Sequence, residues 1–464
     1  MAVLLTVPFG MSLYDGLADS AFAYGGTMAL VVLLSTILRY VGDGTSPVKR
    51  QDAFGIVALV WFSLGLIGGL PFYLEGTVSS MSSAIFESVS GFTTTGATVL
   101  TDIEAVSRPT NLWRHLSHWV GGMGIVVLFV AIFPHLGVGA KHLFRSEASG
   151  PINDTLKPRI RHTAIRLWWI YAGLTLICIS LYVIFGMNWF EAICNAFSTL
   201  STGGFSTRSA SIGGFNSAAI EWVTIMFMFI GGLNFGLYYA LLHGNVKALF
   251  KNYEARVFLA INIVVATSIV LFLMTDGYNV MDGLRTALFQ TVAVTTTAGL
   301  MTDNFDRYPD TIRLMLFFCM FVGGCAGSTS GGLKVSRISI LWKTIVNEIK
   351  HIIRPQAVMS VRIGNRSISD EVLRGIFSFI GIYFLIFALC SLLLSWLGLD
   401  FISAMSSVVA SLSGIGPGLG SVGPSMNYEM VPALGKLILC FCMVAGRLEI
   451  MVVMAIMSPL TWRT

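Results

Sequence analysis

Thr93-Thr94-Thr95-Gly96-Ala97 is the first of four related stretches in this chain, each lying between two long apolar segments. The others read Ser201-Thr202-Gly203-Gly204-Phe205, Thr296-Thr297-Ala298-Gly299-Leu300 and Ser413-Gly414-Ile415-Gly416-Pro417. When the glycines Gly96, Gly204, Gly299 and Gly416 are aligned, a hydroxyl residue stands three places before each of them. A threonine stands two places before the first three. Internal repetition of this kind has to be weighed before any other fold argument.

A potential helix cap precedes each stretch at a similar distance. The four residues are Ser80, Asn188, Asp282 and Asp400, which lie 16, 16, 17 and 16 positions before the aligned glycines. Such side chains cap helices because they accept hydrogen bonds from the first-turn N–H groups. A cap, a short helix and a Thr/Gly turn together form the layout of a re-entrant pore loop. Its non-helical backbone is tolerated at membrane depth only where it is buried in protein or lines a watery cavity.

The composition places the chain in a membrane. Of its 464 residues 55% are hydrophobic and only 11% are charged, which lies outside the range of soluble proteins. Most of its apolar runs reach the roughly 20 residues that cross a bilayer. These runs fall at about residues 25–41, 53–74, 112–133, 165–186, 218–242, 254–275, 311–326, 371–397 and 430–458.

The repeats predict the fold class and the division of the chain. We expect an all-α polytopic membrane protein in which four pseudo-repeated helix–pore-loop–helix units surround one central ion pathway, with an N-terminal helical extension. The predicted extension covers residues 1–48, and the repeats cover 49–150, 151–250, 251–355 and 356–464. Four units on one chain can place their Thr/Gly turns around a single axis.

Those turns suit a cation filter. Rings of backbone carbonyls replace the hydration shell of potassium, glycine allows positive φ and a close approach, and helix C-termini favour cations. The alternative is that Gly and Thr only ease close helix packing, which does not explain the shared offset of caps and hydroxyls. The predicted filter residues are Thr94, Thr95, Gly96, Thr202, Gly203, Gly204, Thr297, Ala298, Gly299, Gly414, Ile415 and Gly416.

Charged residues sort by side of the membrane. If the loop at Lys49-Arg50 is cytoplasmic, 21 of the 29 basic residues fall inside, as the positive-inside rule requires. The pore loops then enter from outside, where 15 of the 24 acidic residues would concentrate cations. The net charge of +5 therefore describes the cytoplasmic face and does not indicate nucleic-acid binding.

The remaining reactive side chains point away from enzymatic chemistry. The seven cysteines lie mostly in apolar runs without a CxxC pair, so we expect buried free thiols. His115 and His118 share a helix face, but two ligands do not make a metal site. The chain lacks a clustered nucleophile, acid–base pair or metal set, which disfavours a membrane enzyme.

At the four turns the chain resembles the Trk/Ktr/HKT superfamily of potassium transport proteins, and in particular its bacterial TrkH-type membrane subunits. The resemblance runs from about residue 53 to the end, and includes Phe86-Glu87-Ser88 and residues 93–98, 200–206, 296–300 and 414–420. The family carries one filter glycine per repeat, and serine at the first-repeat glycine accompanies sodium transport in plant relatives. Gly96 therefore implies potassium. TrkH-type subunits usually carry two full extra spans at the N-terminus, whereas this chain starts within the first.

A glycine-rich stretch interrupts the second apolar segment of the third repeat. Gly323, Gly324, Gly327, Gly331 and Gly332 fall within ten positions and disfavour a continuous helix, so this span should break at membrane depth. The resemblance implies an intramembrane loop, including Lys334, that lies under the filter and blocks the path. A phosphate-binding loop fits poorly, since Leu333 takes the lysine position and an apolar span precedes the loop.

Arg447 lies in the last apolar segment, where a charge is expensive and marks a functional candidate. Its structural alternative is pairing with Glu449 or with helix-end carbonyls, but residues i and i+2 do not share a helix face. The resemblance matches this arginine to a positive barrier that lies below the filter and contacts the gate loop.

The resemblance implies the pore-forming subunit of a Trk-type potassium uptake system in the bacterial inner membrane, with K+ as transported ion and no organic cofactor. The alternative is a secondary transporter that couples cation or other solute uptake to protons or sodium. The lack of inverted repeats and of paired broken helices disfavours a transporter that binds a solute other than a bare cation. TrkH-type subunits form homodimers on a cytosolic ring of nucleotide-binding, TrkA-like regulatory subunits, so we expect both partners. The basic segments 157–161 and 334–374 would dock this ring, or would only set topology and contact anionic lipid.

Overall fold

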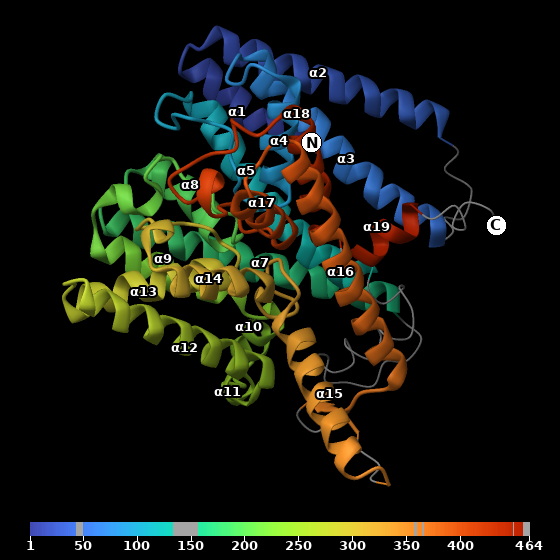
Figure 1. Ribbon diagram of the computed structural model, residues 1–464. Coiled ribbons are helices and arrows are strands. Elements are labelled where there is room, and N and C mark those ends of the chain that lie inside the picture. The colour runs from blue at the N-terminus through green and yellow to red at the C-terminus, as the bar shows by residue number, and fades with distance from the viewer. Residues whose placement is uncertain (43–49, 133–155, 357–359, 364–365, 449, 458–464) are drawn as a thin grey trace.

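The computed structural model describes the chain except for residues 43–49, 133–155, 357–359, 364–365, 449 and 458–464. The described part is almost entirely helical (Figure 1). Its one sheet is the antiparallel pairing of two-residue strands β1 (Arg362–Ile363) and β2 (Arg366–Ser367). The all-α prediction is therefore confirmed.

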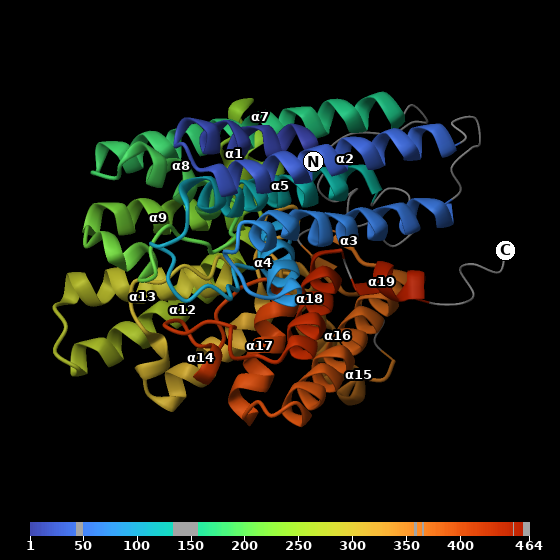
Figure 2. The same ribbon diagram turned by 90° about the horizontal axis from the view of Figure 1, so that it is seen from above.

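The helices form an N-terminal pair and four units of similar design, each with a pore helix between two flanking helices. The four units follow one another around a common centre, from blue through green and yellow to red (Figure 2). The pair is α1 (Ala2–Tyr14) and α2 (Ala18–Val41). The first unit holds α3 (Arg50–Leu74), α4 (Met81–Phe92) and α5 (Arg108–Ile132), and the second holds α7 (Leu156–Ile184), α8 (Trp189–Leu200), η2 (Ser211–Phe215), α9 (Ala218–Gly232), α10 (Phe235–Leu242) and α11 (Lys247–Lys251). The third unit holds α12 (Tyr253–Thr275), α13 (Val280–Thr295), η3 (Phe305–Arg307), α14 (Asp310–Val322) and α15 (Val335–Ile353). The fourth unit holds α16 (Asp370–Trp396), α17 (Phe401–Ser413), η4 (Gly420–Val422), α18 (Ala433–Arg447) and α19 (Ile450–Met457).

Four described helices are long and apolar enough to cross a membrane. They are α2, residues 164–184 of α7, α12 and α16. The pair α9 and α10 qualifies as a fifth span that is bent by 97°. Large apolar side chains such as Leu33, Leu271 and Leu392 are exposed on these helices, which suits lipid and not water.

Two apolar runs that the sequence predicts as continuous are broken. The run at 218–242 bends because Asn234 caps a new helix, accepting a hydrogen bond of 2.6 Å from the Gly236 N–H. The last run ends one helix at Arg447 and starts another at Ile450, and Glu449 lies outside the described residues. All seven cysteines are buried, as predicted.

The third pore helix corrects a predicted cap. Ser80, Asn188 and Asp400 each accept a first-turn N–H and are the N-caps of α4, α8 and α17, as the sequence indicates. Asp282 is not a cap, because α13 already begins after Asn279. Its carboxylate instead forms an ion pair of 2.9 Å with Arg285, one turn further on. The third pore helix is therefore 16 residues long, against 12, 12 and 13 for the others.

Candidate functional site: a ring of four turns and the loop below it

Each pore helix ends in the same irregular turn. Thr94, Thr202, Thr297 and Gly414 adopt positive φ angles of 53°, 52°, 58° and 71°. The following N–H groups, at Thr95, Gly203, Ala298 and Ile415, each donate to a carbonyl five residues back at 2.8–2.9 Å. This closes the helix in a Schellman-type cap, which ordinarily places glycine at the left-handed position. A β-branched threonine is strained there, and such strain clusters at functional sites.

The four aligned glycines also have positive φ, and each faces the next repeat. The φ angles of Gly96, Gly204, Gly299 and Gly416 are 80°, 92°, 64° and 94°. A methyl group built on any of them would overlap a backbone carbonyl oxygen of the following repeat, and Gly416 returns to the first. The facing carbonyls belong, in order, to Gly203, Ala298, Ile415 and Thr95. The four turns therefore form one closed ring of backbone.

Each pore helix is hydrogen-bonded to the non-helical segment that follows its own turn, which we call the filter strand. Glu87, Asn195 and Gln290 all lie nine places before the aligned glycine. Asn195 donates to the Thr207 hydroxyl at 3.0 Å, and Gln290 donates to the Asp303 carbonyl at 3.0 Å. The remaining two anchors are Glu87, which accepts the Val99 N–H at 3.0 Å, and Ser406, which accepts the Leu419 N–H at 2.9 Å.

A cavity of about 120 Å³ opens on one side of the ring and is lined by all four glycines. The strands around it are joined between repeats. The Ser209 N–H donates to Glu104 at 2.9 Å, and the Gly213 N–H donates to the Met301 carbonyl at 3.1 Å. Tyr428 closes the circle, since its N–H donates to the Thr98 carbonyl at 2.8 Å.

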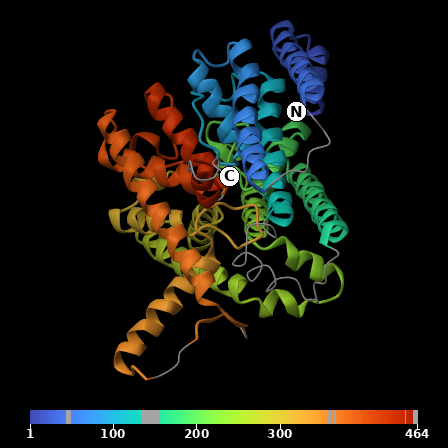
Figure 3. The ribbon, with the colours of Figure 1, turned by 90° about the vertical axis from the view of Figure 1, so that its right-hand side faces the viewer.

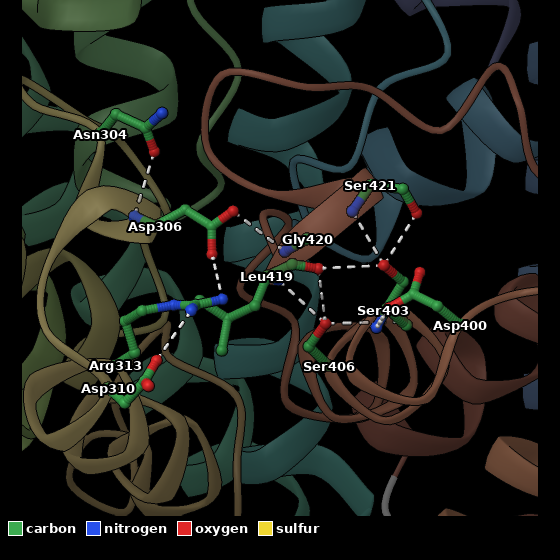
Figure 4. A network of polar contacts seen from close by, with 10 residues as sticks. All are labelled: Asn304, Asp306, Asp310, Arg313, Asp400, Ser403, Ser406, Leu419, Gly420 and Ser421. Atoms are coloured by element: carbon green, nitrogen blue, oxygen red, sulfur yellow. Dashed lines mark hydrogen bonds and ion pairs between the residues drawn. The ribbon is translucent and has the colours of Figure 1, made fainter.

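The third and fourth repeats are joined by a carboxylate (Figure 4). Asp306 accepts the Gly420 N–H at 3.2 Å and pairs with Arg313 at 2.9 Å. Nearby, hydrogen bonding with Ser403 lowers the pKa of Asp400 despite partial burial. At the joint between the first two repeats, burial opposes ionisation of Glu104, but hydrogen bonds from Ser209 outweigh it and lower its pKa. The Asp400 and Glu104 carboxylates are therefore ionised at neutral pH.

The glycine-rich loop packs directly against the ring. α14 ends at Val322 and α15 begins at Val335, so the predicted break is present. The Gly331 N–H donates to the Thr297 hydroxyl at 2.8 Å, and a methyl group on Gly331 would overlap the Ser413 carbonyl. The Thr202 hydroxyl lies 3.2 Å from that of Thr329. The loop thus contacts the turns of the second, third and fourth repeats.

The α9–α10 elbow cradles this loop from the side. The Cys325 and Thr329 N–H groups donate to the carbonyls of Gly232 and Gly231 at 2.9 and 3.2 Å. In return, the Phe235 N–H donates to the Gly327 carbonyl at 3.0 Å. The unpredicted bend of this span therefore supplies the backbone groups that satisfy the loop at membrane depth.

Two charged side chains, one buried and one partly buried, hold the loop. Arg447 donates to the Thr329 carbonyl at 2.7 Å and to the Gly121 carbonyl of α5 at 3.0 Å. Glu254, at the start of α12, accepts the N–H groups of Ala326 and Ser336 at 2.8 and 3.0 Å. One carboxylate therefore joins the glycine-rich stretch, at Ala326, to the first turn of α15, at Ser336.

Every predicted site residue falls in one of these two features. The twelve filter candidates lie in the ring. Lys334 is the N-cap residue of α15, has a φ of 74° and donates to the Ser330 carbonyl. Sequence reasoning missed Glu254 and the four anchors Glu87, Asn195, Gln290 and Ser406. The constant offset of nine residues before the glycines of the first three repeats was a signal that could have found three of the anchors.

Known proteins are similar to this chain over most of its length. The family described as "TrkH: Cation transport protein" matches residues 22–460. The Trk system potassium uptake protein TrkH of Halomonas elongata is 41% identical over 467 residues, covering 99% of this chain and 95% of that protein. The protein of the same name from Escherichia coli K12 is 40% identical over 420 residues, covering 89% and 86%.

A solved structure has the same fold. The crystal structure of the potassium transporter TrkH from Vibrio parahaemolyticus matches with a TM-score of 0.91 at 35% sequence identity, covering 100% of this chain and 96% of that one. The predicted family, the helical fold and the multi-pass membrane location are thereby confirmed, and the chain is a transporter and not an enzyme. This chain belongs to the TrkH cation transport protein family.

Proposed function

We propose that this chain is the ion-translocating subunit of a Trk-type potassium uptake system, with the ring of four turns as its filter. The closed ring, in which each aligned glycine meets a carbonyl of the next repeat, carries this proposal. Carbonyl rings replace the hydration shell of potassium, and the pore-helix C-termini add partial negative charge. Relatives named Trk system potassium uptake proteins favour K+ as the transported ion.

The gate in this proposal is the loop between α14 and α15 together with Arg447. The loop lies against three turns of the ring, and the arginine places a positive charge in the path of an entering cation. Opening then requires the loop to leave the carbonyl-bound arginine. Gly323, Gly327 and Gly332 have positive φ, so their backbone can rearrange where other residues would be strained.

Regulation would come from partners. We propose a homodimer whose inner face docks a cytosolic ring of nucleotide-binding, TrkA-like subunits, with the nucleotide held by the partner. α15 supports this, because it directly follows the gate loop and extends from the body (Figures 1 and 3). Lys343 and Lys350 make part of its surface basic. A displacement of α15 would act on the loop through Ser336, which Glu254 holds.

Complementation tests the function. Expression of this chain in a bacterial host that lacks potassium uptake should restore growth at limiting potassium, and reconstituted vesicles should take up rubidium or potassium in preference to sodium. A secondary transporter is the competing function, and uptake that strictly follows an imposed proton or sodium gradient would favour it. Failure to restore growth, with no potassium flux in vesicles that contain folded protein, would overturn the proposal.

A further inference from the structure

The first repeat differs from the other three in how it anchors its filter strand. Asn195, Gln290 and Ser406 are neutral anchors, whereas the first repeat uses Glu87. The Glu87 carboxylate is fully buried and pairs at 2.8 Å with Arg114 of α5, whose side chain is also fully buried. Such a pair is weak evidence for a stabilising role, because its desolvation offsets much of its attraction.

The acidic partner holds the first filter strand. Glu87 accepts the Val99 N–H at 3.0 Å and the Thr98 hydroxyl at 2.9 and 3.0 Å. These residues follow the filter glycine Gly96 by two and three positions. The carboxylate therefore fixes the backbone immediately beyond the first turn.

The basic partner reaches the second strand. The Arg114 guanidinium carbon lies 4.2 Å from the ring centroid of Phe205, which directly follows the filter glycine Gly204. Arg114 also donates to the Ser206 carbonyl at 3.4 Å. One turn further along α5, His118 stacks on the same Phe205 ring, with centroids 4.0 Å apart and planes 12° from parallel.

We infer that Glu87 and Arg114 form a positioning pair that sets the spacing of the first and second filter strands and thereby the ion selectivity. The Glu87 carboxylate is fully buried and already bonded to Arg114 and Val99. The Arg114 guanidinium lines the cavity beside the ring, but as a cation it cannot coordinate one. Their effect is transmitted where Gly96 packs against the Gly203 carbonyl, a contact that a small shift of either strand changes. The inference rests on the proposed filter function. It identifies a selectivity-determining link that is specific to one side of a pseudo-fourfold ring.

The test compares two double variants in potassium-loaded proteoliposomes. Glu87→Gln/Arg114→Gln removes both charges together, so neither is left buried without its partner. The matched control, Glu221→Gln/Arg285→Gln, removes an ion pair of 2.7 Å between α9 and α13. Size-exclusion behaviour and thermal unfolding report folding, and reversal potentials report the permeability ratio of potassium to sodium.

We expect the first double variant to lose selectivity severalfold and the control to keep the wild-type ratio. Phe205→Leu keeps both charges but removes the ring under Arg114, and it should also lower the ratio. This variant provides the test if the double variant does not fold. A folded Glu87→Gln/Arg114→Gln protein with the wild-type ratio would overturn the inference and leave the proposed function intact. Potassium flux absent from the wild-type vesicles would instead overturn the proposed function.

Discussion

The Arg447 guanidinium donates a hydrogen bond of 2.7 Å to the Thr329 carbonyl, joining the last repeat to the glycine-rich loop of the third. The same side chain reaches the Gly121 carbonyl of the first repeat at 3.0 Å. The buried Arg447 side chain thus links the loop to the first and last repeats, where the loop packs against the ring of turns. In the proposed function, this link restrains the loop and opposes cation entry.

Arg447→Gln should raise the basal potassium flux. The substitution removes the positive charge and leaves at least one of the two carbonyls without its donor, a loss of about 1–3 kcal/mol for the closed arrangement. Flux into proteoliposomes without any regulatory subunit measures the effect. Arg307→Gln, at an exposed arginine of η3, is the control and should leave the flux unchanged. Wild-type flux in a folded Arg447→Gln protein would contradict a gating role.

Glu254→Ala should also raise the basal flux, because it frees the Ala326 N–H in the loop and the Ser336 N–H in the first turn of α15. Glu254→Gln should have a smaller effect, since both N–H groups donate to the same carboxylate oxygen, Oε1, whose place an amide oxygen can take. Glu348→Ala removes an exposed carboxylate from α15 and serves as the control. Equal flux in all three folded variants would show that the clamp does not restrain the loop.

Threonine-to-glycine substitutions should separate turn conformation from contact with the loop. Glycine relieves roughly 1–2 kcal/mol of left-handed strain at either position. Thr297→Gly also removes the acceptor of the Gly331 N–H and should increase basal flux. Thr94→Gly should not, because among the described residues the Thr94 hydroxyl makes no bond to the loop. Indistinguishable basal fluxes from the two variants would count against the Thr297 contact.

Asp306→Ala should lower thermal stability more than Asp310→Ala. Both carboxylates pair with Arg313, but Asp306 also accepts the Gly420 N–H of the fourth repeat, whereas the Asp310 side chain is 97% exposed. The first change should destabilise by about 1–3 kcal/mol and the second by less than about 1 kcal/mol. Matched unfolding curves in detergent measure the difference, and equal melting temperatures would rule out Asp306 as an inter-repeat link.

Local chemistry explains which parts of the site could be predicted. The turns at Thr94 and Gly96 and the caps Ser80, Asn188 and Asp400 depend on residue types at short spacing, which a sequence displays directly. The glycine-rich loop is similar, since its composition alone disfavours a helix. The failed cap at Asp282 shows the limit, because α13 already begins after Asn279 and the Asp282 carboxylate pairs with Arg285 instead.

Long-range pairing explains what could not be predicted. The α9–α10 bend follows from Asn234, yet the sequence there is a continuous apolar run whose break is stabilised by backbone bonds to a loop in the next repeat. The pairing of Glu87 with Arg114 and the clamp of Glu254 on the loop also join residues on different helices. Nothing in their local spacing identifies those partners.

The most direct test of the filter is the reversal potential of Gly96→Ser, measured with potassium on one side of the membrane and sodium on the other. The Gly96 φ of 80° and the adjacent Gly203 carbonyl leave no room for a side chain, so this account predicts a clear fall in the potassium-to-sodium permeability ratio. Gly381→Ser, at an α16 glycine with open space around it, should keep the wild-type ratio. An unchanged ratio in folded, conducting Gly96→Ser protein would contradict the assignment of this ring as the filter.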